Sequence, residues 1–129
     1  DIIHVHGWLA ALLPVYMKHY YKNDALFSET KIVSSVYNQS FEGELDKNFS
    51  SKIQFDGVPQ DAIEALSSPT FENLMKVSVA HSDGVIIASP ELSSGLTKFI
   101  ETSEKPFLPF ASKETIKEVY TSFIKNQLL

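Results

Sequence analysis

Histidine and tryptophan side chains near the start of the chain are the residue types best suited to chemistry. His4 and His6 lie two apart in an apolar, strand-like run, so their side chains point to one side of a sheet. A turn at Gly7 and Trp8 then leads into a helical pattern. Because open α/β sheets bind ligands at the carboxyl ends of their strands, we expect His6 to contact a ligand beside the free amides of the following helix. The alternative is that both imidazoles only hydrogen bond to neighbouring loops.

Trp8 and the pair Tyr37 and Asn38 extend this candidate site. Trp8 is the only tryptophan, and its indole either stacks on a sugar ring or fills the gap between helix and sheet. Tyr37 and Asn38 end the next strand-like run, so we expect them at the same edge of the sheet as His6. Polar groups that converge on one rim favour a small-molecule site. The alternative is that the tyrosine caps the core and the asparagine forms a turn.

Several common kinds of site have no signal in the sequence. The chain has no cysteine, so disulfides and thiolate chemistry are excluded. The His-x-His pair supplies only two ligands and no third residue is spaced to join them, so we expect no metal site. No glycine-rich phosphate loop is present, so neither a dinucleotide site nor a nucleoside triphosphate site is indicated. Ser89 lacks the frame of a nucleophile elbow and is expected to cap the helix that follows it.

Length and charge exclude further classes of function. The 129 residues are 43% hydrophobic and 21% charged, which is typical of one globular domain and not of a disordered chain. A net charge of −5 argues against nucleic acid as a partner, because binding to phosphates needs a basic surface. No apolar run approaches the roughly 20 residues of a membrane span. We therefore expect a cytoplasmic protein with no nucleic-acid partner and no membrane partner.

Strand-like and helix-like patterns alternate along the chain. Strands are expected at Asp1–His6, Lys31–Tyr37, Asp83–Ala88 and Pro106–Leu108. Helices are expected at 9–21, 60–66 and 71–81, then from the turn at Ser89 to about residue 101, and after Ser112. Thr70 is the expected N-cap of the helix at 71–81, and Ser112 is the expected N-cap of the last helix. Pro14 is expected to kink the first helix. The alternation predicts an α/β fold with a mainly parallel sheet, helices on both faces and right-handed crossovers.

The remaining segments lead to three further expectations. Residues 38–59 are irregular apart from one helical turn near 48–52, so we expect a functional loop. The chain begins directly on a strand that looks buried, and four strands are few for such a sheet, so we expect further strands upstream. The exposed strand edges are expected to pair with a second copy and give a homodimer or a swapped arrangement. Aromatic residues at helical spacing are expected in the core: Tyr16, Tyr20, Phe99, Tyr120 and Phe123.

Three motifs, taken in order, resemble one family of glycosyltransferases. They are HVHGW with the following ALLPVY helix, the strand end SVYNQSFEG, and the run NLMKVSVAHSDGVIIASPEL. In this order they resemble the amino-terminal domain of bacterial glycogen synthases and plant starch synthases. The resemblance implies that residues 1–129 form a partial Rossmann-like domain of a two-domain enzyme of the GT-B type. It also implies transfer of glucose from ADP-glucose to an α-1,4-glucan with retention of configuration, with no further cofactor.

The resemblance also assigns roles to particular residues. His6, Gly7 and Trp8 match the turn that lines the cleft between the two domains, and Tyr37 and Asn38 match a His-Asn pair beside the transferred sugar. Phe41, Glu42 and Gly43 match an aromatic-Gln-Gly segment on the acceptor side. Gly7 stands where many members have Asp, and Tyr37 replaces the histidine that faces the donor sugar. A phenol is a poor general base at neutral pH, and these residues include neither the family's Lys-x-Gly-Gly loop nor its carboxyl-terminal nucleotide domain. We therefore expect a fragment that is inactive alone. The alternative is a non-catalytic glucan-binding or regulatory module of the same descent.

Overall fold

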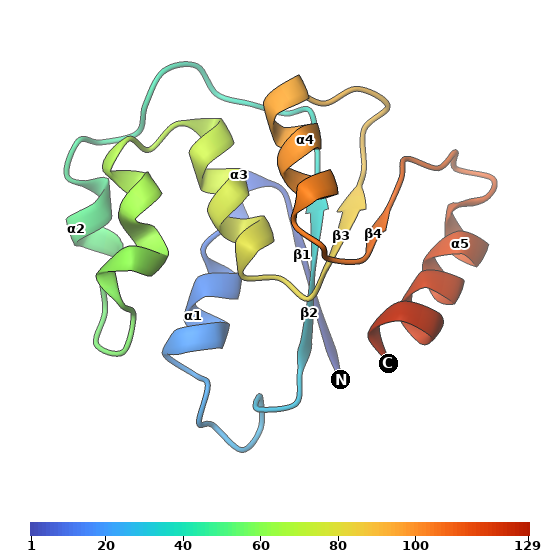
Figure 1. Cartoon of the computed structure of the whole chain (residues 1–129), viewed down its shortest axis with the longest axis horizontal. Helices are drawn as coiled ribbons and strands as arrows, with labels where there is room; N and C mark the ends of the chain where they lie inside the picture. Colours follow the sequence, from blue (N-terminus) through green and yellow to red (C-terminus); the bar gives the residue numbers. More distant parts are fainter.

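A parallel four-stranded sheet organises the chain, of which the computed structural model describes residues 1–129. Its strands are β1 (Ile2–His6), β2 (Lys31–Val36), β3 (Gly84–Ile87) and β4 (Phe107–Leu108), and they lie in chain order across the sheet (Figure 1). Every pairing is parallel. The predicted α/β fold is therefore confirmed, and each strand end lies within one residue of its predicted place.

Helices cover both faces of this sheet, as predicted. Because the strands follow one another in one direction, right-handed crossovers carry the connecting helices to the same face. The helices α1 (Leu13–His19), α3 (Phe71–Ala80) and α4 (Ser94–Thr102) pack there, whereas α5 (Ile116–Phe123) and the π-helical turn η3 (Ile124–Leu128) pack on the opposite face (Figure 1). Three short helices complete the chain: η1 (Trp8–Ala10), α2 (Phe49–Ile53) and η2 (Gln60–Ser67). None of the helices has the length and apolar character that crossing a membrane requires.

Two apolar clusters form the core, one on each face of the sheet. On β3, Val85 belongs to the larger cluster and Ile86 to the smaller one, because successive side chains of a strand point to opposite faces. The larger cluster includes Val15, Leu74 and Ile100 from the three crossover helices. The smaller cluster is closed by side chains of α5 and η3. The C-terminal segment is therefore the only cover that the second face receives from this chain.

Gly84, the first residue of β3, makes room for this cover. A Cβ atom at Gly84 would lie 2.9 Å from Leu128 Cδ2 and 3.2 Å from Phe123 Cζ. We expect Gly84→Ala to push the C-terminal segment off the sheet and to lower the free energy of unfolding by about 1–3 kcal/mol. Urea denaturation of the two proteins measures this difference.

Gly95→Ala is the matched control for that prediction. A Cβ atom at Gly95, in the first turn of α4, would meet only the flexible end of the Glu72 side chain, which is free to move. Alanine also favours the helix, so we expect no loss and a gain of up to about 1 kcal/mol. If the two substitutions changed stability by the same amount, the packing of the C-terminal segment against Gly84 would not be the cause.

The first helix is shorter than its apolar pattern predicted. Residues Trp8–Ala10 form a separate 3₁₀ turn, and α1 begins at Leu13. Pro14 lies in the first turn of α1, where its missing N–H would have had no partner, so the predicted kink is wrong. Leu9 is 83% exposed and Tyr20 is 53% exposed. Both residues lie beyond the ends of α1. The prediction from helical spacing that Tyr20 lies in the core is therefore wrong. Of the other aromatic residues, Phe123 is buried and Tyr16, Phe99 and Tyr120 are partly buried.

One predicted helix cap is confirmed and two are wrong. Thr70 caps α3 through its hydroxyl, as predicted. The cap of α4 is Ser93 and not Ser89. Ser89 precedes Pro90, and the residue before a proline avoids the helical region, so the helix starts later. Ser112 caps nothing with its side chain, because a backbone turn that begins at this residue delays α5 until residue 116.

The segment 38–59 is irregular, as predicted, and its apolar side chains, among them the buried Ile53 and Val58, pack into the larger core cluster. The helical turn expected near 48–52 is present as α2. A single antiparallel bridge between Glu44 and Thr70 holds the loop to the start of α3. This arrangement leaves Glu42 and Gly43 exposed ahead of the bridge.

Candidate functional site

His6 and Tyr37 meet at the carboxyl edge of the sheet. His6 is the last residue of β1 and lies opposite Ser35 in the parallel register, while Tyr37 directly follows β2. The His6 Nδ1 atom and the Tyr37 hydroxyl are 2.9 Å apart and form a hydrogen bond. Gly7 has a φ of +67°, and a Cβ atom there would lie 3.9 Å from the Tyr37 ring, so its glycine allows the turn to pass close to the tyrosine. The prediction that these residues share one edge is confirmed.

His4 lies one pleat below His6 and supports it from within the fold. The two imidazole rings stack with their centroids 4.0 Å apart. His4 Nε2 is 2.6 Å from the Ser35 hydroxyl, and its Nδ1 is 3.3 Å from the Tyr120 hydroxyl of α5. Burial, with a smaller contribution from the nearby His6, lowers the pKa of His4 to about 4, so this ring is neutral at pH 7. For His4 the structural interpretation therefore holds, with partners on β2 and α5 and not on loops.

A hollow of about 340 Å³ opens beside His6 and Tyr37, between the carboxyl edge of the sheet and the C-terminal segment. This volume is at the lower end of the range of about 300–1,000 Å³ typical of small-molecule pockets. The far wall is built by Phe110, Lys113 and Tyr120. No carboxylate lines it, and Lys113 is its only ammonium group. The pocket therefore offers aromatic faces, hydrogen-bond donors and positive charge to a ligand.

Trp8 and Phe41 face away from this pocket. Their rings meet edge to face with centroids 4.9 Å apart, and Phe41 in turn meets Phe71 at 6.0 Å. All three pack against the larger core cluster on the α3 side of the sheet. The indole therefore fills the gap between helix and sheet, which is the alternative that the sequence left open.

The other predicted site residues do not line the pocket. The Asn38 side chain is exposed, and its backbone N–H donates to the Ser89 hydroxyl at 2.8 Å, which ties the ends of β2 and β3 together. Glu42 and Gly43 are exposed on the loop, away from the pocket lining. The structure thus brings together His6, Gly7 and Tyr37. A binding role for any predicted residue remains a prediction.

Comparison with known proteins shows the family of this chain. The family model described as the starch synthase catalytic domain matches residues 1–102. The chain belongs to the starch synthase catalytic-domain family. It is 35% identical over 92 residues to the glycogen synthase of Thermotoga petrophila, which covers 70% of this chain and 18% of that protein. It is 32% identical over 100 residues to the glycogen synthase of Elusimicrobium minutum, covering 75% of this chain and 20% of that protein. No solved structure matches the chain.

The match to the starch synthase family ends before the far wall of the pocket begins. The family model stops at residue 102, whereas Phe110, Lys113 and Tyr120 all follow it. Sequence patterns did not predict a site role for these three residues, and Tyr120 was expected in the core. The predicted topology could have indicated them. Three right-handed crossovers place their helices on one face of the sheet, so the last helix must cover the opposite face. One side of the pocket, with His6 and Tyr37, therefore lies within the family match, and the far wall lies outside it.

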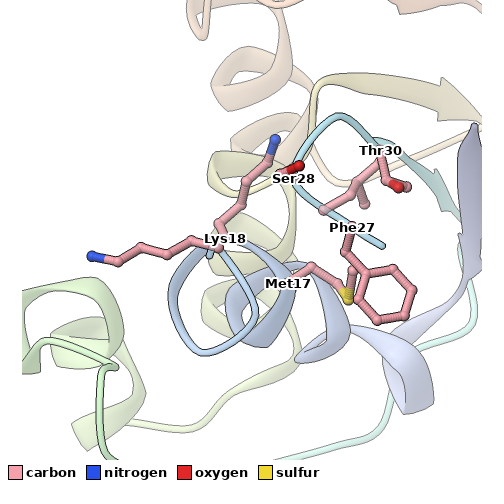
Figure 2. A pocket seen from close by; sticks show the side chains of 7 residues that line it. Met17, Lys18, Phe27, Ser28 and Thr30 are labelled. Carbon is pink, nitrogen blue, oxygen red and sulfur yellow. The ribbon is translucent and has the colours of Figure 1, made fainter. Parts of the chain in front are cut away.

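A second, smaller hollow lies at the opposite end of the sheet. Figure 2 shows its labelled side chains, which come from α1 and from the loop that leads into β2. It measures about 80 Å³, and its lining includes Lys18 and Lys22. The Lys18 ammonium is already held by both oxygens of Asp83 at 2.8 Å. None of the predicted site residues lines this second hollow. The hollow beside His6 and Tyr37 is therefore the candidate site. No three His, Cys, Asp or Glu side chains converge on a point that would hold a metal ion.

Proposed function

We propose that this chain forms one rim of the sugar cleft of a glycogen or starch synthase-like glucosyltransferase. The enzyme of which it is a part would transfer glucose from ADP-glucose to the end of an α-1,4-glucan. The observation that carries this proposal is the His6–Tyr37 hydrogen bond, which stands over a pocket at the carboxyl edge of the sheet in a chain of this family. The relatives described above carry the name glycogen synthase, which supports the same activity.

The pocket suits the sugar-nucleotide donor better than the neutral glucan. Its lining includes the Lys113 ammonium and no carboxylate, although the chain as a whole carries a net charge of −5. An ammonium beside two aromatic faces favours a ligand that joins a phosphate to a ring. We therefore assign ADP-glucose, and not the glucan chain, to this pocket.

The pocket binds and orients a sugar, but it offers no carboxylate to take a proton. In the transfer, the bond from glucose C1 to the phosphate oxygen breaks, and a bond from C1 to the O4 of the glucan forms. ADP leaves with the phosphate oxygen, and the proton lost by the glucan hydroxyl passes to that oxygen or to solvent. The pocket lining holds imidazole and phenol groups together with one ammonium group. The chain spans only about a fifth of the length of its curated relatives, so we assign the rest of the chemistry to parts outside it.

The isolated chain is expected to bind ADP-glucose weakly and to transfer no glucose. The measurements are an NMR titration of the labelled chain with ADP-glucose, and an assay of labelled glucose incorporated into maltohexaose. We expect shifts centred on His6 and Tyr37 at millimolar concentrations, and incorporation no greater than in a blank without protein. Robust extension of maltohexaose would show that the chain is complete as a catalyst and would contradict this assignment.

A non-catalytic glucan-binding module of the same descent is the second candidate. The observation that favours it is Tyr37, whose hydroxyl is occupied by His6 where the family resemblance places a histidine facing the sugar. Retention of the chain on immobilised glycogen, without any response to ADP-glucose, would support this second function over the first.

A further inference from the structure

We infer that His6 donates the hydrogen bond that this pocket makes to a bound sugar nucleotide, and that Tyr37 acts through His6 as a positioning residue. This inference rests on the proposed function and deepens it. His6 and Tyr37, both predicted to contact the ligand, thus have different roles.

The first step is the position of the proton between the two side chains. A neutral imidazole has one N–H and one bare nitrogen, and a phenol has one O–H. The phenol is the more acidic of the two donors, so the stronger arrangement has the Tyr37 O–H donating to His6 Nδ1 across 2.9 Å. The proton of His6 then resides on Nε2. Tyr37 thereby fixes which face of the ring carries the donor.

The second step is that the Nε2–H of His6 has no partner in the protein. The side chain is exposed, it lines the pocket, and its only hydrogen bond is the one through Nδ1. No carboxylate lines the pocket to accept this proton. The acceptor must therefore come from solvent or from a ligand, and a sugar hydroxyl or a phosphate oxygen is such an acceptor.

The third step is that the ring is held in place from behind. His4 stacks under His6 at 4.0 Å, and His4 is itself fixed by hydrogen bonds on both nitrogens. One of these bonds comes from Tyr120 on α5, which also stacks on His4 with centroids 5.5 Å apart. The His6 donor is therefore preorganised by His4 and Tyr37, which lowers the cost of ordering it on binding.

The fourth step concerns Tyr37 itself. Its single O–H is used by His6, so the ligand gains a hydrogen-bond donor from the pair only at His6 Nε2. If Tyr37 acts through His6, removal of its hydroxyl should matter only while His6 is present. That condition separates a positioning residue from a direct contact.

A double-mutant cycle tests this condition with ADP-glucose as the probe. We compare the 129-residue chain with His6→Gln, Tyr37→Phe and the double variant by NMR titration. We expect His6→Gln to weaken binding about tenfold and Tyr37→Phe about threefold, since each changes one hydrogen bond. In the His6→Gln background, Tyr37→Phe is expected to change affinity by less than about 1.5-fold. Losses that multiply in the double variant would overturn the inference, because Tyr37 would then contact the ligand directly.

Tyr20→Phe is the matched control for the loss of a phenol hydroxyl. Tyr20 is 53% exposed, follows the end of α1 and lies outside the pocket lining. We expect it to leave the affinity unchanged. The amide spectrum of each variant shows whether it is folded, so a loss of binding through unfolding is recognised.

The nitrogen resonances of His6 give a second readout that needs no ligand. At pH 8 we expect Nε2 of His6 to carry the proton and Nδ1 to show the shift of a nitrogen that accepts a hydrogen bond. Tyr37→Phe should remove that shift, whereas Tyr20→Phe should not. A proton on Nδ1 would overturn the inference even if ADP-glucose binds. Correct nitrogen shifts in a chain that binds no ADP-glucose would instead overturn both the proposed function and the role of His6 in it.

Discussion

Replacing Asp83 with alanine is expected to lower the free energy of unfolding by about 2–4 kcal/mol, a large share of the stability of a domain of this size. The Asp83 side chain is 23% exposed, and each of its oxygens lies 2.8 Å from the Lys18 ammonium. The Oδ2 atom also accepts the backbone N–H of Ile32 at 2.8 Å. Without the carboxylate, this N–H and a partly buried ammonium lose their partner together. A second lysine, Lys105, loses the negative charge that partly offsets the lowering of its pKa by burial.

The same residue fixes the register of the sheet. The backbone N–H of Asp83 donates to the Ile32 carbonyl at 2.8 Å, so Asp83 and Ile32 bind one another through both backbone and side chain. This exchange lies just ahead of β3, where β2 and β3 begin to pair. The loss of Asp83 is therefore expected to loosen β2, which ends next to Tyr37. Hydrogen exchange of the β2 amides would show this loosening directly.

A second substitution at Asp83 separates the ion pair from the bond to the backbone, and a substitution at Asp46 is its control. Asp83→Asn keeps an oxygen that can accept from Ile32 but removes the charge, so we expect about half the loss caused by alanine. As the control, Asp46→Asn breaks an exposed ion pair with Lys52, and we expect little change because solvent screens exposed pairs. Urea denaturation of the three variants at pH 7.5 measures the series. If Asp83→Ala were no more harmful than Asp46→Asn, the bonds around Asp83 would not stabilise the fold.

The strands and their shared edge could be predicted from the sequence because both follow from local rules. Runs of β-branched and apolar residues give β2 and β3 within one residue at each end. Once the strands are parallel, their carboxyl ends must meet at one edge. The contact between His6 and Tyr37 then follows from their places at the ends of β1 and β2.

The sides to which single side chains turn could not be predicted in this way. Trp8 follows Gly7, whose φ of +67° redirects the chain, and the indole ends on the α3 side of the sheet, away from His6. Nothing in the sequence spacing fixes that angle. The choice of Ser93 over Ser89 as a helix cap likewise depends on how Pro90 extends the turn.

The far wall of the pocket was missed because its contacts are distant in sequence. Tyr120 reaches His4 across more than a hundred residues, and its place in an apolar stripe gave no sign of a polar partner. The tip of a partly buried tyrosine needs a hydrogen bond, and His4 is the residue that provides it. A pattern confined to one helix does not contain that information.

Acidification from pH 7.5 to pH 5 is expected to destabilise the fold through three of its four histidines. Burial lowers the pKa of His4 to about 4, below the 6.5 of an unperturbed histidine. Burial is also the largest cause that lowers the pKa of His19 and of His81. Between pH 6.5 and the lower folded-state pKa values, the unfolded chain binds more protons than the folded one. The contribution of these three rings to the free energy of unfolding is therefore fully present above pH 6.5, and it is lost as the pH falls.

The hydrogen bonds show why these rings resist protonation. His81 Nδ1 lies 2.8 Å from the Val77 carbonyl, so it carries a proton and donates. His81 Nε2, 3.1 Å from His19 Nε2, must then accept from His19. A second proton on His81 would place two donors against each other, and the ammonium groups of Lys18 and Lys105 also oppose the added charge. The folded state therefore favours the neutral form of both rings, in line with the lowered pKa values of His19 and His81.

Measurement of unfolding at pH 7.5 and pH 5 in three proteins tests this account. For His4 alone we expect a loss of about 1 kcal/mol at pH 5, because solvent around a half-exposed ring reduces the full effect of the pKa shift to about half. His4→Gln and His81→Gln, which do not titrate, should each show a smaller difference between the two pH values than the wild type. The carboxyl groups with lowered pKa values, Asp46 and Glu114, titrate below this range and leave the comparison clean. An equal loss in all three proteins would mean that the buried imidazoles are not the cause, and that the pairs His4–Tyr120 and His19–His81 do not depend on neutral rings.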